Sequence, residues 1–569
     1  MRLNRFAGII VPLIFLIVMS WYNSLMVQSY NYTIFDLGLS YRLMYLFAYH
    51  HTIIYYGRDI LFSPDPFGKY IFIPLSIALY LYNNITTPLL LQIIVIASGG
   101  YAIFKISHFI SGSVFISIVI ELSYFLYPST YGFMAHGGNY QVLIEGFILI
   151  GYMFYIQKKE MLGYLFFTMA SLTNIWGPPI VVTFILVDLV TRYRLFHPIR
   201  IKDSLNKLNY KSIFSFKNNR KMILLLIFFT FEIVIFLQTV RYSGGFSNLI
   251  ASSRLSVATA TSFTNSSNSI FSGFFDQFSN FKLPFFYHIL SPVLFIPLLT
   301  PYFILILLYL LISWWTPNTV YYNLLQQYPY LFASFIFIGT IHFFKKLTVD
   351  RQSLKLAKKL AVLILISSII SFSLYSPFSV SNFQNGTVQQ EMHVSNFDKK
   401  LTYGLSLIPN NSTVFIQNDL PQLMNREEVF MPGYYQNETV DYAVIIPFGF
   451  SPISDQYSGY SSYWASEFQN NKSYGIYENI MGAIIYKLDY YSSPVYCVTV
   501  KKVIVPDEDS LNKNSQMVNN TFFVSTFKNF YSNSLWRCSN NSLSLCMYNL
   551  TFHLITEMVP IENCINEMY

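Results

Sequence analysis

Apolar runs long enough to cross a lipid bilayer recur through residues 1–376 and are absent from residues 377–569. A straight helical span takes about 20 such residues. Only 11% of the chain is charged, whereas soluble domains carry roughly 25%. The pattern therefore predicts a polytopic α-helical membrane bundle over residues 1–376. The candidate spans are 7–27, 70–83, 88–107, 113–127, 140–157, 161–174, 178–191, 222–240, 286–300, 302–315, 329–344 and 360–376.

Lysine and arginine gather between these spans. Nine of them lie between Arg192 and Lys221, and a second group runs from Lys345 to Lys359. Basic loops of membrane proteins stay on the cytoplasmic side. We therefore expect both loops and the N-terminus to be cytoplasmic in the plasma membrane, and we expect no nucleic-acid partner despite the net charge of +8.

The number of crossings follows from this topology. A cytoplasmic N-terminus and an external C-terminal part need an odd number, so about eleven of the twelve candidates should cross. The weakest is 113–127, because counting it places the 192–221 loop outside. Several spans are short and interrupted by proline, which a membrane tolerates only where protein or water satisfies the backbone. A compact bundle around an internal cavity is therefore predicted.

The C-terminal part divides in two. Residues 377–490 contain the strand-like runs "STVFIQND" and "VDYAVIIPF" and the hairpin-like "YGIYENIMGAIIYKL", which predict a small extracytoplasmic α/β domain. Residues 491–569 form a β-rich extension that holds all four cysteines. An even number of cysteines in one soluble segment predicts disulfides in an oxidising compartment, with three pairings open. The cysteines are Cys497, Cys538, Cys546 and Cys564.

Asn-x-Ser/Thr sequons are frequent in the same part, which favours an external, glycosylated domain. The predicted glycosylation sites are Asn31, Asn265, Asn385, Asn410, Asn411, Asn437, Asn471, Asn519, Asn540 and Asn549.

The first external loop carries an acid, Asp36, shortly after the first apolar run. The following stretch, "LSYRLMYLFAYHHTIIYYG", has helical apolar spacing and predicts an amphipathic helix in the membrane interface. Asp36 is either a catalytic carboxylate at headgroup depth or a helix N-cap.

Several motifs occur in one order along the chain: "FDLG" (35–38), "PLSIALYLY" with "PLLLQ" (74–92), His136 in its loop, "FIPLLTP" (295–301), "YYNLLQQYPY" (321–330) and "LIPNNSTVFIQNDLPQLMNREEVFMPG" with "DYAVI". Together they resemble the prokaryotic, especially archaeal, membrane proteins known as domain of unknown function family 2079, which is related to GT-C-type glycosyltransferases. The resemblance covers about residues 1–490. It departs at Arg42, where the family has Gln, and at Lys69, where it has His.

The resemblance implies a GT-C-like bundle that transfers a sugar from a polyprenyl-phosphate carrier on the external face. Asp36 is then the candidate base and His136 a second acid/base or a metal ligand. For His136, a structural hydrogen bond is the alternative. Candidate groups for binding the substrate or its phosphate are Arg42, Arg58, Lys69, Arg254 and Tyr328. The alternatives are snorkelling for Arg42 and Lys69, and a place in the interfacial aromatic belt for Tyr328.

Two further functions stay open. A degenerate enzyme scaffold could act as a glycosylated cell-surface protein that binds a surface layer, an appendage or another protein. The acids Glu121, Glu145, Asp188 and Glu232, which lie within predicted spans, instead allow a transporter. No metal motif is present, although a divalent cation is a candidate cofactor of the transferase. Membrane lipids and a lipid-linked sugar are the expected partners.

Overall fold

The computed structural model describes, with a few short gaps, residues 3–51, 70–192, 278–384, 392–430, 439–446, 464–490, 497–500 and 558–561. The chain folds as two compact units. The helical unit comprises Met1–Asn23, Leu43–Ile53 and Phe62–Val388, and the sheet unit comprises Ser24–Arg42, Ile54–Leu61 and Gln389–Tyr569. Residues 24–42 of the first loop therefore belong to the sheet unit.

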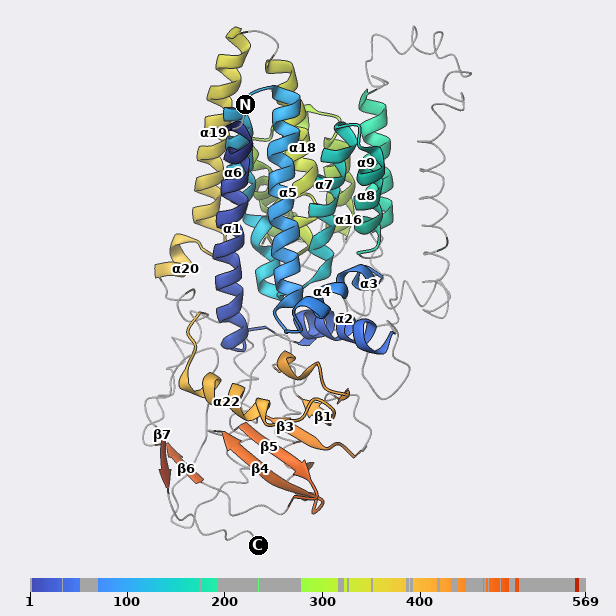
Figure 1. Ribbon diagram of the computed structural model, residues 1–569. Helices are drawn as coiled ribbons and strands as arrows, with labels where there is room; N and C mark the ends of the chain where they lie inside the picture. The colour runs from blue at the N-terminus through green and yellow to red at the C-terminus, as the bar shows by residue number, and fades with distance from the viewer. Residues whose placement is uncertain are drawn as a thin grey trace, which may run out of the picture. The chain divides into compact units, whose positions relative to one another are not determined.

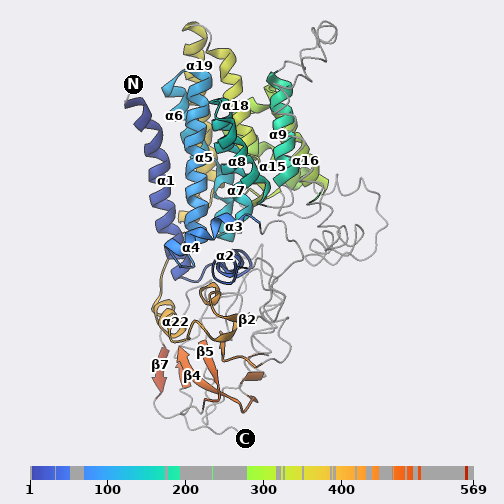
Figure 2. The ribbon, with the colours of Figure 1, turned by 45° about the vertical axis from the view of Figure 1, so that its right-hand side comes forward.

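The helical unit is a bundle of roughly antiparallel helices (Figures 1 and 2). Among the described residues, three helices are long and apolar enough to cross a membrane: Ala7–Gln28, Thr87–Ser111 and Gln352–Tyr375. The bundle helices are α1 (Leu3–Gln28), α5 (Thr87–Ser111), α6 (Val114–Phe125), α7 (Leu143–Ile156), α8 (Glu160–Ser171), α9 (Gly177–Arg192), α16 (Phe303–Trp315), α18 (Ala333–Leu347) and α19 (Arg351–Tyr375).

Shorter elements connect these helices. They are the π-helical turn η1 (Ile34–Gly38), α2 (Leu39–His50), α3 (Phe72–Leu75), α4 (Ile77–Leu81), η3 (Pro128–His136), η4 (Tyr140–Val142), η5 (Phe278–Lys282), α15 (Leu283–Leu290), η6 (Ser291–Val293), η7 (Ile296–Leu299), α17 (Gln327–Tyr330) and α20 (Val380–Gln384).

Two predicted spans are not single helices. Segment 70–83 folds as α3 and α4, of four and five residues, and at about 1.5 Å per residue neither approaches the roughly 30 Å of a bilayer core. Segment 286–300 is broken into α15, η6 and η7. Neither segment is one regular helix: Pro74 lies within α3, and Pro292 and Pro297 lie in η6 and η7. The crossing of each segment stays a prediction. The total of about eleven crossings stays a prediction, because most of 222–240 lies outside the described residues.

Segment 113–127, in contrast, contains a regular helix. Gly112 has a left-handed backbone with φ of 66° and ends α5, and the Ser113 side chain caps α6 by accepting a hydrogen bond from the Ile116 amide. The short turn places α6 antiparallel to α5 in the bundle (Figure 1). The weakest of the predicted spans is thus an integral bundle helix.

Glycines allow α5 and α7 to pack closely. A Cβ atom built on Gly146 would lie 2.6 Å from the backbone oxygen of Val95, and one on Gly99 would lie 3.2 Å from the Cα atom of Gly146. Small residues at such a crossing bring two helix backbones together, which is how helices associate where the surrounding lipid is as apolar as their side chains.

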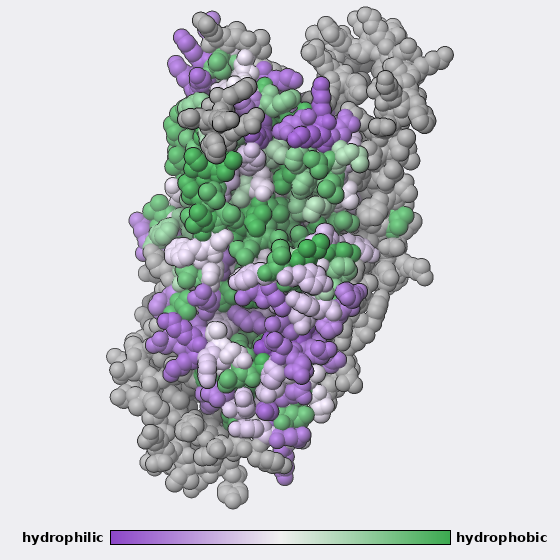
Figure 3. All heavy atoms as spheres, in the orientation of Figure 1, coloured by the Kyte–Doolittle hydropathy of each residue, from purple (hydrophilic) through white to green (hydrophobic). Residues whose placement is uncertain are grey.

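The outer surface of the bundle is apolar. A green band covers α1, α5 and α19 in Figure 3, and Ile14, Ile17 and Trp21 on α1 are more than half exposed. Exposed Lys355 and Lys358 belong to the first turns of α19, at the end of the bundle where α18 joins it. The N-terminus and the turn after α5 lie at the same end (Figure 1). This grouping agrees with a basic cytoplasmic end, which stays a prediction.

The sheet unit contains a five-stranded sheet in the order β2-β1-β3-β5-β4. Strand β1 pairs in parallel with β2 and β3, whereas β5 pairs antiparallel with β3 and β4. The strands are β1 (Thr413–Ile416), β2 (Glu428–Phe430), β3 (Tyr442–Ile445), β4 (Tyr474–Ile480) and β5 (Ala483–Leu488), and a separate pair is formed by β6 (Cys497–Val500) and β7 (Met558–Ile561). Strands β1 and β3 and the β4–β5 hairpin coincide with the three runs singled out in the sequence.

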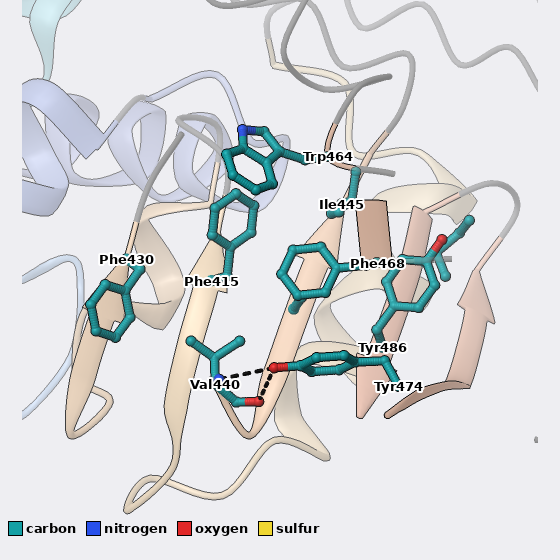
Figure 4. Close-up of a cluster of buried hydrophobic side chains, with 10 residues drawn as sticks. Phe415, Phe430, Val440, Ile445, Trp464, Phe468, Tyr474 and Tyr486 are labelled. Carbon is teal, nitrogen blue, oxygen red and sulfur yellow. Dashed lines mark hydrogen bonds between the residues drawn. The ribbon is translucent and has the colours of Figure 1, made fainter. Parts of the chain in front are cut away.

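An aromatic core fills one side of this sheet. Phe415 packs against Trp464 and Phe468 with ring centroids 5.1 and 5.2 Å apart (Figure 4). The Tyr474 hydroxyl accepts from the Val440 amide and donates to its carbonyl, both at 2.9 Å. Helix α22 (Asn396–Ser406) begins with a capping box between Ser395 and Asp398.

Candidate functional site

Asp36 lies in the middle of the π-helical turn η1, which continues directly into α2. Ile34 and Leu37 are fully buried on either side, while Asp36 itself is half-buried. The acid is therefore inside the first helical turn and not at an N-cap, and the helix dipole stabilises its negative charge there. A half-buried carboxylate on a fixed turn can accept a proton from a bound hydroxyl group.

Arg42, six residues later on α2, is 2% exposed. Its Nη1 donates hydrogen bonds to the carbonyls of Met424, at 3.3 Å, and of Arg426, and its Nη2 donates to the carbonyl of Glu427 at 2.8 Å. The planar fork of a guanidinium suits such a set of converging oxygens. The predicted contact with a phosphate is untested, and the structure shows the side chain engaged with backbone oxygens.

Three other contacts hold the same segment of the first loop within the sheet unit. The hydroxyl groups of Tyr30 and Thr402 are 2.9 Å apart, and Gln422 Nε2 donates to the carbonyl of Val27 at 3.1 Å. A Cβ atom at Gly38 would lie 3.1 Å from Met424 Cγ, so glycine leaves room here for the Met424 side chain. Burial raises the pKa of the Tyr30 phenol well above its ordinary value, and the hydroxyl therefore stays a neutral partner.

The predicted His136 loop belongs to the helical unit. Its backbone is held by Gln92 on α5, whose Nε2 donates to the Asn139 carbonyl at 3.1 Å and whose Oε1 accepts from the Gly138 amide at 3.2 Å. His136 ends η3, and its side chain lies outside the described residues. A small, mainly apolar hollow beside Gln92 is lined by Met44, Phe72, Leu75, Pro88, Leu91, Gly138, Asn139, Tyr140 and Leu143.

A polar network is buried inside the bundle. Of its residues, only Asp188 was singled out from the sequence. Asp188 Oδ1 accepts from the hydroxyls of Tyr152, at 3.1 Å, and Tyr302, at 2.8 Å. His342 Nε2 lies 2.8 Å from the Tyr152 hydroxyl and 3.3 Å from that of Tyr302. Because the four residues come from segments far apart in the sequence, no local motif could reveal the network.

We predict that this network stabilises the bundle. Asp188→Ala removes the acceptor of two tyrosine hydroxyls and should lower the free energy of unfolding by about 1–3 kcal/mol. Thermal unfolding of the purified protein in detergent would measure the loss. Asp188→Asn, which keeps one acceptor oxygen, is the matched control and should lose less. An unfolding temperature of Asp188→Ala equal to the wild-type value would contradict the prediction.

Glu145 and Glu121 are also fully buried in the helical unit. The Glu145 carboxyl lies beside the Tyr124 hydroxyl, which is itself 2.9 Å from the hydroxyl of Tyr330. Within the described part of the chain, no hydrogen bond of normal geometry reaches either carboxyl. These acids were noted from the sequence as intramembrane residues, and Glu232 lies outside the described residues.

The structure describes only some of the remaining predicted site residues. Tyr328 is on α17, although its side chain is not described, and Cys497 begins β6. Asn410, Asn411 and Asn471 are exposed, as glycosylation requires, whereas half-buried Asn31 donates to Ser29 Oγ at 2.7 Å. Outside the described residues lie Arg58, Lys69, Arg254, Asn265, Asn385, Asn437, Asn519, Asn540, Asn549, Cys538, Cys546 and Cys564. No group of three or more metal-binding side chains occurs within the described ranges.

Two comparisons with known proteins bear on these residues. A family model described as "Predicted membrane protein (DUF2079)" matches residues 27–485, which include the Asp36 turn, the bundle and the five-stranded sheet. A search of curated proteins finds no match. The family model agrees with the resemblance carried by the sequence motifs, and its description specifies a membrane protein without an activity.

Proposed function

We propose, from the premise that this chain belongs to the DUF2079 family of predicted membrane proteins, that it is a membrane glycosyltransferase. It would transfer a sugar from a polyprenyl-phosphate carrier at the external face of the plasma membrane. The observation that carries the proposal is the position of Asp36. Asp36 is half-buried on a fixed turn. The turn starts six residues after a helix of membrane-spanning length. Asp36 would therefore reach a carrier phosphate at headgroup depth.

The proposed reaction uses Asp36 as the general base. The oxygen of an acceptor hydroxyl attacks the anomeric carbon of the sugar, and the bond between that carbon and the phosphate oxygen breaks. The phosphate leaves on the lipid with the bonding electrons, and the acceptor proton passes to the carboxylate of Asp36. Such proton transfer contributes typically 10²–10⁴-fold to a rate.

The leaving phosphate needs positive charge. Lys69, Arg58 and Arg254 stay the candidates from the sequence, because a guanidinium or ammonium group binds phosphate with charge-assisted hydrogen bonds. Arg42 is not in this proposed set, since its guanidinium is engaged with three backbone carbonyls. A divalent cation is a further candidate for the same role.

The direct test is reconstitution. The purified protein is placed in liposomes with a radiolabelled sugar on a polyprenyl phosphate and a lipid extract as the source of acceptor. We expect label to move to an acceptor and lipid phosphate to co-purify with the protein in mass spectrometry. Failure to transfer label, with no lipid phosphate bound, would reject the proposal.

The exposed sequons favour a second candidate. Asn410, Asn411 and Asn471 are accessible on the sheet unit, and Arg42 and Lys69 stand where the resemblance to the family implies Gln and His. Both features suit a glycosylated cell-surface scaffold that has lost catalysis. Co-purification of a stoichiometric protein partner, with no bound lipid phosphate, would favour this function over sugar transfer.

A further inference from the structure

The first-loop segment, defined as residues 24–42, belongs to the same compact unit as the chain from residue 389 onward. More than 340 residues of sequence separate the two parts. The segment contains the η1 turn with Asp36 and ends at Arg42. The sheet unit is thus assembled from pieces on both sides of the bundle sequence.

Arg42 donates three hydrogen bonds from the first-loop segment to the C-terminal part of the sheet unit. The carbonyls of Met424, Arg426 and Glu427 all accept from its guanidinium, and they lie between η9 (Pro421–Leu423) and β2 at the edge of the sheet. Carbonyls in such a connecting turn are not used by the strand ladder, so a buried donor can satisfy them. A guanidinium with several N–H groups does this in one plane, whereas an ammonium group cannot reproduce its fork geometry.

The other contacts spread along the segment and reach different parts of the sheet unit. Tyr30 meets Thr402 on α22, Val27 accepts from Gln422 on η9, and Gly38 lies against Met424. Contacts at both ends and in the middle fix the orientation of the segment, and Asp36 lies between them. The turn that carries the acid is therefore held from the sheet unit.

We infer that Arg42 is a positioning residue that joins the first-loop segment to the sheet unit and so fixes the Asp36 turn. The sheet unit is then incomplete without residues 24–42. The catalytic role of the fixed turn rests on the proposed function. The joining of residues 24–42 to the rest of the sheet unit does not, because it is a property of the fold.

The joining is tested by cutting the chain in the full-length protein. A protease site is placed within residues 385–391, between α20 and α22, and the purified protein is cleaved in detergent. The wild-type C-terminal fragment should co-elute with the N-terminal fragment, because it still binds residues 24–42. Arg42→Met should release at least tenfold more of it, and Lys399→Met, at an exposed cation of α22, should release none beyond wild type. Equal retention in Arg42→Met and wild type would overturn the inference.

Arg42→Lys covers the case in which Arg42→Met does not fold. It keeps the charge but loses the fork, so fragment release should lie between the wild-type and Arg42→Met values, and wild-type retention would count against the inference.

Sugar transfer gives the second readout. A positioning role predicts that Arg42→Lys lowers kcat with little change in the KM for the lipid-linked donor, whereas a phosphate ligand would raise that KM. A raised KM with unchanged kcat would therefore reject the positioning role. If no protein transfers sugar, the proposed function fails while the cleavage result still decides whether Arg42 joins the two pieces.

Discussion

Asp36→Asn is expected to lower kcat for sugar transfer about 100-fold, the lower end of what general-base catalysis contributes. The amide has nearly the size of the carboxyl group but cannot accept the acceptor's proton. Because Asp36 is half-buried on a turn fixed by its neighbours Ile34 and Leu37, the substitution should leave the turn in place. Initial rates with purified protein in liposomes would measure the effect.

The matched control is Glu467→Gln, which removes an exposed acid from the same unit and should transfer sugar at the wild-type rate. Size-exclusion profiles of both variants check that the fold is retained. An Asp36→Asn rate within twofold of wild type would remove this residue from the mechanism, and the acid in the first helical turn would then serve only to stabilise that helix.

Gly146→Leu is expected to prevent the helical unit from folding, which is the largest stability effect that the bundle offers. Even a single Cβ atom at this position would lie 2.5 Å from Val95 Cγ1 and 2.6 Å from the Val95 oxygen. Backbone atoms cannot move aside as a flexible side chain does, so α5 and α7 would have to separate. Overpacking of this kind costs typically 1–3 kcal/mol for small additions, and a leucine side chain adds much more.

A graded series makes this prediction measurable. Gly146→Ala should lower the unfolding temperature of the detergent-purified protein, and Gly146→Leu should yield little monodisperse protein. Ile94→Leu, at an exposed position of α5, should behave as wild type, since surface changes of this kind stay within about 0.5 kcal/mol. Normal yield and stability of Gly146→Leu would show that α5 and α7 do not pack as described.

Much of the molecule could be predicted from local sequence. The apolar runs predicted α5, α7 and α19, and the strand-like runs predicted β1, β3 and the β4–β5 hairpin, because hydrophobic length and periodicity are properties of neighbouring residues. The same reasoning did not predict that 70–83 and 286–300 are divided into shorter helical pieces. There the average hydropathy is high enough for a span, but proline and local packing break the helix.

The candidate site was predicted only in part. Asp36 lies in a turn shortly after the first long helix, in a part of the chain that the family model covers, and its catalytic role stays a prediction. The partners of Arg42 and of Asp188 could not be predicted, because Met424, Arg426 and Glu427, like Tyr152, Tyr302 and His342, are distant in sequence. A sequence pattern shows that a charged residue stands in an apolar stretch, but not whether it is buried or which groups it contacts.

The sequence by itself determined that this is a membrane protein with a strand-containing C-terminal part, because the cost of placing charges in lipid restricts where they occur. Only the tertiary structure decided that the first-loop segment belongs with the C-terminal sheet and that Arg42 faces backbone carbonyls. The physical reason is that a buried guanidinium must find oxygen acceptors wherever the fold supplies them. Here they come from residues 424–427, more than 380 positions later in the chain.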